Sequence, residues 1–312
     1  MTNRTQPTST FTITLPATSA NLGPAFDAAA LAFSMFLKVR AQAADEFSLA
    51  ARGRDAAICG RMEDHLILST YREVLQEQGK PILPLALRLE NEIPIGKGCG
   101  SSAAARLAGI ALAVHYGRLR WNDRRIVGEA ARREHHPDNA AACWLGGLAI
   151  ARMAMAESGE AQVVRILPKG EWPLLLAVPN ESLSTEEARR VLPQQYSRAD
   201  AVTNIQNSML LLAAFTQGRG DLLRAALEDR IHQPYRAGLC PLLPALQPLA
   251  GSKGILGMAL SGAGPSVLIF LDPKAGVNAT RKRVGAHLDQ QGLQAALFHT
   301  EVTARGARQK IV

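Results

Sequence analysis

The pattern of apolar and polar residues in the first half of the chain predicts both strands and helices. Phe11–Pro16 alternates apolar and polar residues, which is typical of a strand with one buried face. Asp64–Gln78 instead has apolar residues at helical spacing. We also expect strands at Ala30–Val39, Phe47–Ala51, Leu85–Leu89 and Leu148–Met155, and helices at 103–116, from Asn122-Asp123 to about Glu134, and from Pro137 to Gly146-Gly147.

The second half alternates helices and strands in the same way, after a turn at Glu157–Glu160 that we interpret as a domain boundary. We expect strands at Val163–Leu167, Leu174–Pro179, Ser266–Leu271 and Ala296–Val302, and helices at Thr185–Leu192, Ala201–Gly218, Gly220–Ile231 and Gly276–Gln290. This order predicts an α+β protein with two domains, residues 1–157 and 158–312. A frayed tail is expected before about residue 10.

Composition is ordinary for a soluble globular protein, since 47% of the 312 residues are hydrophobic and 20% are charged. No apolar run approaches the roughly 20 residues that cross a bilayer, and the N-terminus has no apolar signal core. The four cysteines, Cys59, Cys99, Cys143 and Cys240, lie far apart without a C-x-x-C pair. We therefore expect a cytoplasmic protein with reduced thiols and no membrane partner.

The formal net charge of +8 raises the question of a nucleic-acid partner. The basic residues are scattered, however, and the densest clusters are Arg118–Arg125, Arg132-Arg133, Arg281–Arg283 and Arg305–Lys310. Aromatic residues make up only 5% of the chain and show no stacking repeat. A weak preference for anionic substrates explains the charge more simply, so we expect no nucleic-acid partner.

A glycine-rich loop precedes the helix predicted at 103–116. Its alternate glycines remove Cβ atoms and permit positive φ, so backbone N–H groups can gather around an anion. Two serines follow at the helix N-terminus, where free amides and the helix dipole favour phosphate. The sequence thus predicts a phosphate cradle made of Pro94, Ile95, Gly96, Lys97, Gly98, Cys99, Gly100, Ser101 and Ser102.

Two common phosphate loops do not fit this cradle. A P-loop needs serine or threonine directly after its lysine, and Lys97 is followed by Gly98. The dinucleotide fingerprint needs glycine where the chain has Ser101. A flexible loop before a core helix is the remaining alternative. Within the loop, Cys99 is either activated by the helix N-terminus or a small packing residue, and packing is the simpler interpretation.

Three further segments place small polar and charged groups in loops. Residues 16–27, PATSANLGPAFD, offer groups that hold a small polar molecule but also suit an Asx turn. In residues 134–142, EHHPDNAAA, a carboxylate before a proline-bent turn suits a divalent cation, or else simply ends a helix whose histidines complement the dipole. Residues 254–267 contain Ser-Gly-Ala-Gly-Pro-Ser, which by itself predicts a hairpin turn.

In this order, the segments resemble the motifs of the homoserine kinase family of GHMP kinases. The cradle is similar to P-x-x-x-G-L-G-S-S-A-A, with Cys99 in place of leucine. Residues 16–27 resemble P-A-T-S-A-N-L-G-P-G-F-D, with Ala25 at a glycine position, which is strained if that position needs positive φ. Residues 134–141 resemble E-G-H-P-D-N-V-A, with His135 where glycine is usual. Further similar segments are S-G-A-G-P-S at 261–266, S-T-x-x-A-R at 184–189 and H-Q-P-Y-R at 232–236.

The resemblance implies a two-domain GHMP kinase fold, with an N-terminal domain of the ribosomal protein S5 type and a ferredoxin-like C-terminal domain, usually as a homodimer. It implies transfer of the γ-phosphoryl group of ATP to the side-chain hydroxyl of L-homoserine, a step of threonine biosynthesis. The cradle would hold the triphosphate, and Ser102 and Glu134 would bind Mg²⁺. The amino acid would be held by Asn21, Asp27, His136, Asn139, Thr185, Arg189, Arg236 and Gly262.

The resemblance also bears on proton transfer. Some GHMP kinases have an aspartate near the attacked hydroxyl, where this chain has Asn139, and an asparagine does not accept a proton. Because phosphoryl transfer passes through a loose transition state, positioning and charge stabilisation carry most of the rate. We therefore expect Asn139, Ser102 and Glu134 to be the catalytic residues, without a dedicated side-chain base. His136 is the candidate if a base exists.

Other functions stay open at this point. One is a GHMP kinase acting on a different alcohol, such as a mevalonate-like one, although Asn21, Asp27 and the two arginines suit a zwitterion. Another is a catalytically silent GHMP-like protein or a basic nucleic-acid binder, against which Ser102 and Glu134 argue.

Overall fold

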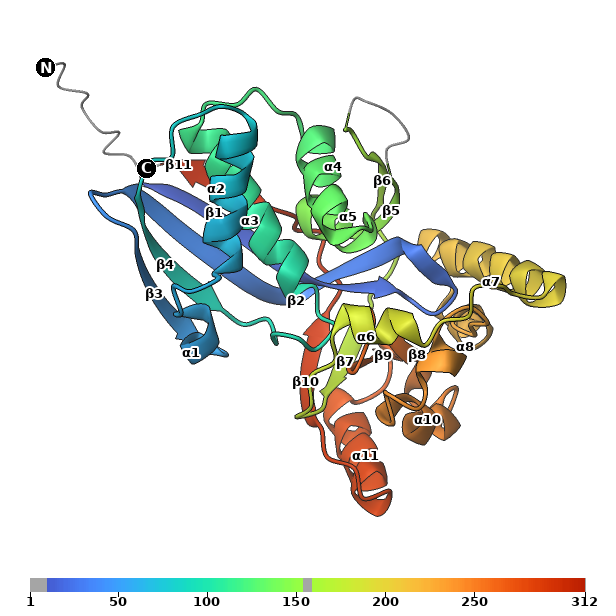
Figure 1. Ribbon diagram of the computed structural model, residues 1–312. Helices are drawn as coiled ribbons and strands as arrows, with labels where there is room; N and C mark the ends of the chain where they lie inside the picture. The colour runs from blue at the N-terminus through green and yellow to red at the C-terminus, as the bar shows by residue number, and fades with distance from the viewer. Residues whose placement is uncertain (1–9, 154–158, 312) are drawn as a thin grey trace, which may run out of the picture.

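The computed structural model describes residues 10–153 and 159–311 (Figure 1). The predicted tail before residue 10 and the predicted domain boundary between residues 157 and 158 lie outside the described residues. Within them, the chain forms two sheets, with β1 beginning as predicted at Phe11. Their α+β arrangement agrees with the predicted fold class.

The larger sheet is organised around two long strands. Its strands are β1 (Phe11–Asn21), β2 (Ala25–Ala43), β3 (Ser48–Gly53), β4 (Leu85–Asn91), β5 (Leu148–Arg152), β6 (Gln162–Ile166) and β11 (Arg308–Ile311). Their order is β11-β1-β2-β4-β3, and β5 pairs with the first part of β2 and with β6. Because β2 has 19 residues, it reaches both β4 and β5. The sequence predicted only parts of β1 and β2, since their remaining residues are small and polar and show no clear alternation.

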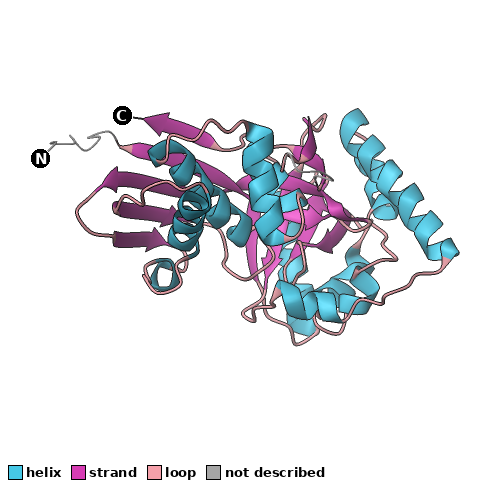
Figure 2. Ribbon diagram, turned by 45° about the horizontal axis from the view of Figure 1, so that its top comes forward, coloured by secondary structure: helices cyan, strands magenta, loops and turns pink. Residues whose placement is uncertain are grey.

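One face of this sheet carries the helices. These are α2 (Leu66–Glu77), α3 (Ser101–Tyr116), α4 (Asp123–Glu134) and α5 (Asp138–Leu145), while the short α1 (Ala56–Cys59) lies beside β3. α3 and α5 pack directly on β1. The side chain of Asn122 accepts a hydrogen bond from the Arg125 amide at 2.8 Å, so it begins α4 as predicted. In Figures 1 and 2 these helices stand beside the strands of the large sheet.

The smaller sheet is antiparallel and has the order β10-β7-β9-β8. Its strands are β7 (Pro173–Val178), β8 (Ile255–Leu260), β9 (Val267–Leu271) and β10 (Ala296–Glu301). Leu174 and Leu176 point into the core shared with the large sheet, whereas Leu175 and Ala177 point into a second core. Both faces are therefore buried, and β8 and β9 form the hairpin predicted around Ser-Gly-Ala-Gly-Pro-Ser.

The second half of the chain also contains short helices that periodicity did not predict. Its helices are α6 (Thr185–Arg190), α7 (Arg198–Gln217), α8 (Leu223–Ala226), α9 (Gln233–Arg236), α10 (Leu242–Leu246) and α11 (Val277–Gln290), with 3₁₀ turns η1 (Gly220–Leu222) and η2 (Gln247–Leu249). The helix predicted over Gly220–Ile231 is wrong beyond Ala226. There, Asp229 accepts hydrogen bonds from the amides of Ile231 and His232, which replace helical bonds.

Two strands from beyond residue 158, β6 and β11, belong to the large sheet, so the chain returns to the first unit at its end. β11 comes from the basic tail, which has no apolar alternation and was not predicted as a strand. None of the helices in the described part of the chain is long and apolar enough to cross a membrane.

His135 ends α4 with a φ of 65°, in the left-handed region that favours glycine. We expect His135→Gly to raise the free energy of unfolding by about 0.5–1 kcal/mol, because it relieves this backbone strain. Urea denaturation followed by circular dichroism measures the effect. His135→Ala is the matched control, since it removes the exposed ring but keeps the Cβ, and it should bring no gain. Equal stabilisation by both variants would contradict the backbone explanation.

Candidate active site

A cavity of about 640 Å³ lies where five loops and helix ends from both halves of the chain meet. It is bounded by the turn after β1, the glycine-rich loop, the α4–α5 connection, α6 and the β8–β9 turn, with Arg236 of α9 at its base. Its lining includes Asn21, Asp27, Gly96, Gly98, Gly100, Ser101, Ser102, Glu134, His136, Asp138, Asn139, Thr185, Arg189, Arg236, Gly262 and Gly264. Every residue predicted to hold the amino acid is among them.

The glycine-rich loop is pressed between two other loops. A Cβ on Gly98 would lie 2.1 Å from the carbonyl oxygen of Ser261, and one on Gly100 would lie 1.9 Å from Thr18 Oγ1. Both glycines also have positive φ. The hydroxyl of Ser261 donates to the Gly98 carbonyl at 2.8 Å, and the Thr18 amide donates to the Cys99 carbonyl at 3.1 Å. The loop is thus held by close contacts that leave no room for a side chain at Gly98 or Gly100.

The N-terminus of α3 opens into the cavity. Ser101, Ser102 and Ala103 all line it, and the first helical bond is made only by the Ala104 amide, to Gly100 at 3.0 Å. The three preceding amides therefore have no helical acceptor. Free amides at the positive end of a 16-residue helix form a site for an anion.

Ser102 and Glu134 lie together beside these amides. Ser102 Oγ donates to Glu134 Oε1 at 2.7 Å, and Arg106 Nε contacts the same oxygen at 2.5 Å. A hydroxyl and one carboxylate are hard oxygen ligands of the kind that Mg²⁺ uses when phosphate and water complete its shell. The described residues contain no group of three or more histidines, cysteines or acidic residues suited to hold a metal by themselves. The pair fits a metal that arrives with a phosphate.

His136 and Asp138 form a buried pair next to Asn139. His136 Nδ1 and Asp138 Oδ1 are 2.8 Å apart, and the same oxygen accepts from the Asn139 amide at 2.6 Å. Burial alone would lower the pKa of His136, but the hydrogen bond and charge of Asp138, with smaller contributions from Glu134 and Asp27, outweigh it and raise the pKa. Thr18 Oγ1 donates to Asn139 Oδ1 at 2.6 Å, so the side-chain nitrogen Nδ2 of Asn139 points away from Thr18.

The turn after β1 is an unusual run of left-handed residues. Asn21, Leu22 and Gly23 have φ values of 70°, 43° and 74°. Asn21 stabilises the turn through both ends of its side chain, since Nδ2 donates to Gly262 at 2.8 Å and Oδ1 accepts from the Asp27 amide at 3.0 Å. Ala25 is not among the described residues with positive φ, so its replacement of glycine causes no strain there.

Two arginines approach the cavity from α6 and α9. Arg189 Nη2 contacts Asp27 Oδ1 at 2.7 Å, and both side chains remain about one-third exposed. Arg236 is only 1% exposed. Both guanidinium groups lie over the ring of Phe26, at 5.3 and 5.4 Å from its centroid. Burial and the charge of Arg189 lower the pKa of Arg236, so an anion in the cavity would stabilise it.

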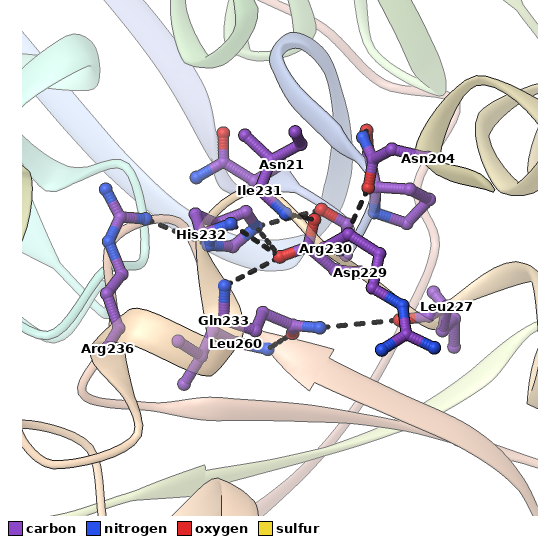
Figure 3. A network of polar contacts seen from close by, with 12 residues as sticks. Asn21, Asn204, Leu227, Asp229, Arg230, Ile231, His232, Gln233, Arg236 and Leu260 are labelled. Carbon is purple, nitrogen blue, oxygen red and sulfur yellow. Dashed lines mark hydrogen bonds and ion pairs between the residues drawn. The ribbon is translucent and has the colours of Figure 1, made fainter. Parts of the chain in front are cut away.

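Figure 3 shows the polar network that holds Arg236 in place. Its Nε donates to the Ala188 carbonyl at 3.0 Å, and Nη1 lies 3.0 Å from His232 Nδ1. His232 Nε2 in turn lies 2.8 Å from the Gly23 carbonyl. Because that carbonyl accepts only, Nε2 carries the proton and Nδ1 accepts from Arg236. Burial lowers the pKa of His232, which keeps the ring neutral as this chain of bonds requires.

Asp229 stabilises the segment that contains His232 and leads into α9. Its carboxylate accepts from the backbone amides of Ile231, His232 and Gln233 at 2.6–2.8 Å. Asp229 thereby begins α9 in the way of a capping residue and sets the direction in which Arg236 points (Figure 3). The H-Q-P-Y-R segment alone gave no indication of this support, because Asp229 precedes the motif.

A second, more apolar hollow lies on the other side of the glycine-rich loop. It has a volume of about 1090 Å³ and is lined mainly by residues of β2, α1, α2 and β4, including Leu37, Ile58, Cys59, Leu66, Ile67, Leu89, Ile93 and Ile95. Gly96, Ser101 and Ser102 line both hollows. The helix N-terminus therefore lies between an apolar chamber and a polar one.

Some predicted residues of the cradle do not reach either hollow. Pro94 and Cys99 are buried beneath the loop, and Lys97 donates to the backbone carbonyl of Asn180. Burial raises the pKa of the Cys99 thiol to about 12, so Cys99 is a packing residue. The sequence did not single out Thr18, Arg106 or Asp138, although Thr18 and Asp138 lie inside the motifs and Arg106 follows Ser102 by one helical turn.

Comparison with known proteins agrees with this geometry. The models of the GHMP kinases N terminal domain and the GHMP kinases C terminal domain match residues 65–147 and 211–290. The chain is 43% identical to a homoserine kinase of Solibacter usitatus, covering 95% of this chain and 96% of that one. It is 34% identical to a homoserine kinase of Deinococcus radiodurans, covering 96% and 97%.

Solved structures show the same fold. The crystal structure of a homoserine kinase from Cytophaga hutchinsonii superposes with a TM-score of 0.80 at 22% identity, covering 96% of this chain and 97% of that one. A phosphomevalonate kinase of Streptococcus pneumoniae gives a TM-score of 0.62 at 13% identity, covering 97% and 98%. At these identities, the likeness concerns the fold alone.

The buried pair of His136 and Asp138 makes a pH dependence testable. We expect Asp138→Asn to lower the pKa of His136, measured by the NMR titration of its ring without divalent cations. Because the folded-state pKa lies above the unfolded value of 6.5, protonation stabilises the fold. The stability advantage of the unsubstituted protein should be complete below pH 6.5 and fall as pH rises through the folded-state pKa. An unaltered pKa of His136 would refute the pairing.

Proposed function

The chain belongs to the homoserine kinase family of GHMP kinases, and we propose that it transfers the γ-phosphoryl group of ATP to the side-chain hydroxyl of L-homoserine. The observation that carries the proposal is the polarity of the 640 Å³ cavity. The free amides of α3 lie at one side of this cavity, and the buried guanidinium of Arg236 lies at another. Such a cavity suits two anionic groups, a phosphate and a carboxylate, with a hydroxyl between them.

The two hollows beside the glycine-rich loop suggest how ATP would bind across this loop. The apolar hollow suits a purine and its ribose, and the shared residues Gly96, Ser101 and Ser102 suit the phosphates. The γ-phosphate would then enter the polar cavity. Ser102 and Glu134 would hold Mg²⁺, which supplies charge neutralisation between the β- and γ-phosphates when bound. Arg106 holds Glu134 in position for this role.

The amino-acid end of the cavity suits a zwitterion. Arg236 and Arg189 would bind the α-carboxylate, since guanidinium groups pair with carboxylates in a bidentate way. Asp27 would meet the ammonium group, and its contact with Arg189 keeps both charges balanced before substrate arrives. Asn21, His136, Thr185 and Gly262 line the remaining wall. These roles are proposals drawn from the motifs and from the position of each side chain.

In the reaction, the substrate oxygen forms a bond to the γ-phosphorus while the bond to the bridging oxygen of ADP breaks. Asn139, held by Thr18, would orient the hydroxyl. Because Asp138 engages Nδ1 of His136, only Nε2 of the ring could accept a proton, and we propose that His136 positions the substrate. We therefore propose that the hydroxyl proton passes to solvent or to a phosphoryl oxygen, because a loose transition state needs little help from a base.

A coupled ADP-release assay tests this function. We expect turnover with Mg-ATP that depends on L-homoserine, and at least a 100-fold loss in Glu134→Gln, because phosphate charge is no longer neutralised. L-Serine, L-threonine, mevalonate and a sugar serve as comparison substrates. Binding of ATP without turnover on homoserine, but with turnover on another alcohol, would replace the proposed substrate and keep the kinase. Turnover on none would contradict both.

We also propose that the chain acts as a homodimer through α7. Three large apolar residues at positions i, i+3 and i+7 of this helix, Val202, Ile205 and Met209, are 47%, 63% and 62% exposed. Figure 1 shows α7 at the outside of the molecule. A face of this kind suits the same face of a second copy.

We expect Ile205→Glu/Met209→Glu to sediment as a monomer, whereas the unsubstituted chain sediments as a dimer, because two buried carboxylates per copy would be unpaired. Gln76→Glu/Gln291→Glu adds the same charge at exposed positions on α2 and at the end of α11, away from α7, and should stay dimeric. Sedimentation velocity distinguishes the outcomes. A dimer in both variants would show that another surface is used.

A further inference from the structure

The face of the large sheet opposite α2–α5 gathers positive charge from four strands. Along β2, Lys38 and Arg40 are exposed while their neighbours Leu37, Val39 and Ala41 are buried. The same alternation places Arg88 of β4 and Arg52 of β3 on the exposed side. The exposed side chains of adjacent strands therefore form rows across the sheet.

The strand register defines two such rows, which we call the basic sheet face. From β11 to β3, the first row contains Arg308, Thr14, Lys38, Glu90 and Arg52, and the second contains Lys310, Thr12, Arg40, Arg88 and Ala50. The six basic residues of the two rows are up to 272 positions apart in the sequence (310 − 38). The sequence pattern of scattered basic residues is thus misleading for six of them, because pairing of distant strands brings them together.

The basic sheet face is strongly unbalanced in charge. Six cations against one carboxylate give it +5, compared with +8 for the whole chain. Glu90 is already shared between Lys38, at 3.6 Å, and Arg52. Asp45 and Glu46 lie in the turn after β2 and belong to neither row. A field of this size attracts anions from solution.

Arg40 and Arg88 are the two positive charges of the basic sheet face that face each other directly. They stand directly opposite each other in the antiparallel ladder of β2 and β4. Like charges at facing positions destabilise a sheet, and no salt bridge to either arginine is found among the described residues. The fold itself therefore gains nothing from placing two guanidinium groups together, whereas an anion bound between them would relieve the repulsion.

The surface between these residues is concave. A hollow of about 730 Å³ is lined by Lys38, Arg40, Arg52 and Arg88, by one carboxylate, Glu90, and by Ala50, Ala51 and Leu89. The small side chains leave room in front of the arginines. Since neighbouring strands are ~4.8 Å apart, the five strands span ~19 Å, comparable with the width of a nucleic-acid duplex.

We propose that the basic sheet face binds the phosphodiester backbone of a nucleic acid without reading its bases. Arginine pairs with phosphate in a bidentate way, and hydroxyls such as those of Thr12 and Thr14 are common phosphate partners. The two rows contain no aromatic residue on which a base could stack. Recognition is therefore of charge and shape, and it is independent of sequence.

Two other polyanions fit less well. A membrane of anionic lipids is flat, whereas the face is hollowed, and the two rows offer no large apolar side chain for insertion into the interface. An acidic peptide would bind a sheet edge or an apolar groove in addition to charge, whereas the unpaired charge here is centred on Arg40 and Arg88 of the inner strands β2 and β4. The proposal does not depend on the proposed kinase activity, because the cavity of that activity lies among loops and helix ends beyond the opposite face.

Fluorescence anisotropy with a labelled duplex of about 20 base pairs tests the proposal across a series of KCl concentrations. We expect the logarithm of the binding constant to fall linearly with the logarithm of salt, with a slope of about −4 to −5. Arg40→Gln/Arg88→Gln/Arg308→Gln should weaken binding at least 10-fold and reduce the slope by about 2 to 3, because three phosphate contacts are lost.

Arg120→Gln/Arg281→Gln/Lys282→Gln is the matched control, since it removes the same charge from exposed positions elsewhere. It should keep the slope and bind within about 3-fold of the unsubstituted chain. Thermal unfolding by circular dichroism establishes that both variants are folded, independently of any enzymatic assay. Equal loss in both variants would overturn the proposal, because it would mean that overall charge alone drives binding.

Vesicles with phosphatidylserine and a poly-glutamate peptide, tested under the same salt conditions, separate the alternatives. Binding to the duplex that exceeds binding to both, and that is lost selectively in the Arg40/Arg88/Arg308 variant, supports the proposal. Absence of salt-dependent binding to the duplex, or stronger binding to vesicles or peptide, would overturn it.

Discussion

The close contact of three loops at Gly98 and Gly100 is the constraint on which the site depends. A single Cβ at Gly98 would meet the backbone of Ser261, and one at Gly100 would meet Thr18. These contacts set the start of α3 against the turn after β1 and against the β8–β9 turn. The helix N-terminus, the Asn21 turn and Gly262 can therefore face one cavity only because the loop between them has no side chain at Gly98 and Gly100.

The positive charge of Arg236 in the cavity is held in place by buried hydrogen bonds rather than by solvent. Arg236 is almost fully buried, and its direction is set by His232, Ala188 and, through α9, by Asp229. Such preorganisation costs desolvation when the protein folds, but it leaves no reorganisation for the moment of binding. The neutral state of His232 is part of this device, since a second cation beside Arg236 would break the chain of hydrogen bonds to Gly23.

The two faces of the large sheet have different environments, since one is covered by helices and the other is exposed. The face covered by α2–α5 builds the core and positions the glycine-rich loop and Glu134. The opposite face carries the rows around Arg40 and Arg88, which are exposed. A sheet that packs on one face leaves the other face to solvent, and here the charge of that face is far from neutral.

Much of this protein was readable from its sequence, because the signals are local. Periodicity predicted α2, the Asn122-Asp123 cap predicted the start of α4, and the Ser-Gly-Ala-Gly-Pro-Ser segment predicted the β8–β9 hairpin. Glycine spacing predicted the anion site at Ser101 and Ser102. The resemblance of the motifs indicated the family and which residues share the cavity. Short or polar elements such as α9 and β11 escaped, since four residues show no period.

What only the tertiary structure decided are relations between distant residues. No local pattern indicates that Asp229 orients Arg236, that Thr18 holds Asn139, or that Lys97 turns away to Asn180. Nor does it indicate that Arg40 faces Arg88, since strand register depends on which segments pair across the sheet. The sequence determined the chemistry available to the chain, whereas the pairing and packing of remote segments decided which groups meet, because burial and register are properties of the whole fold.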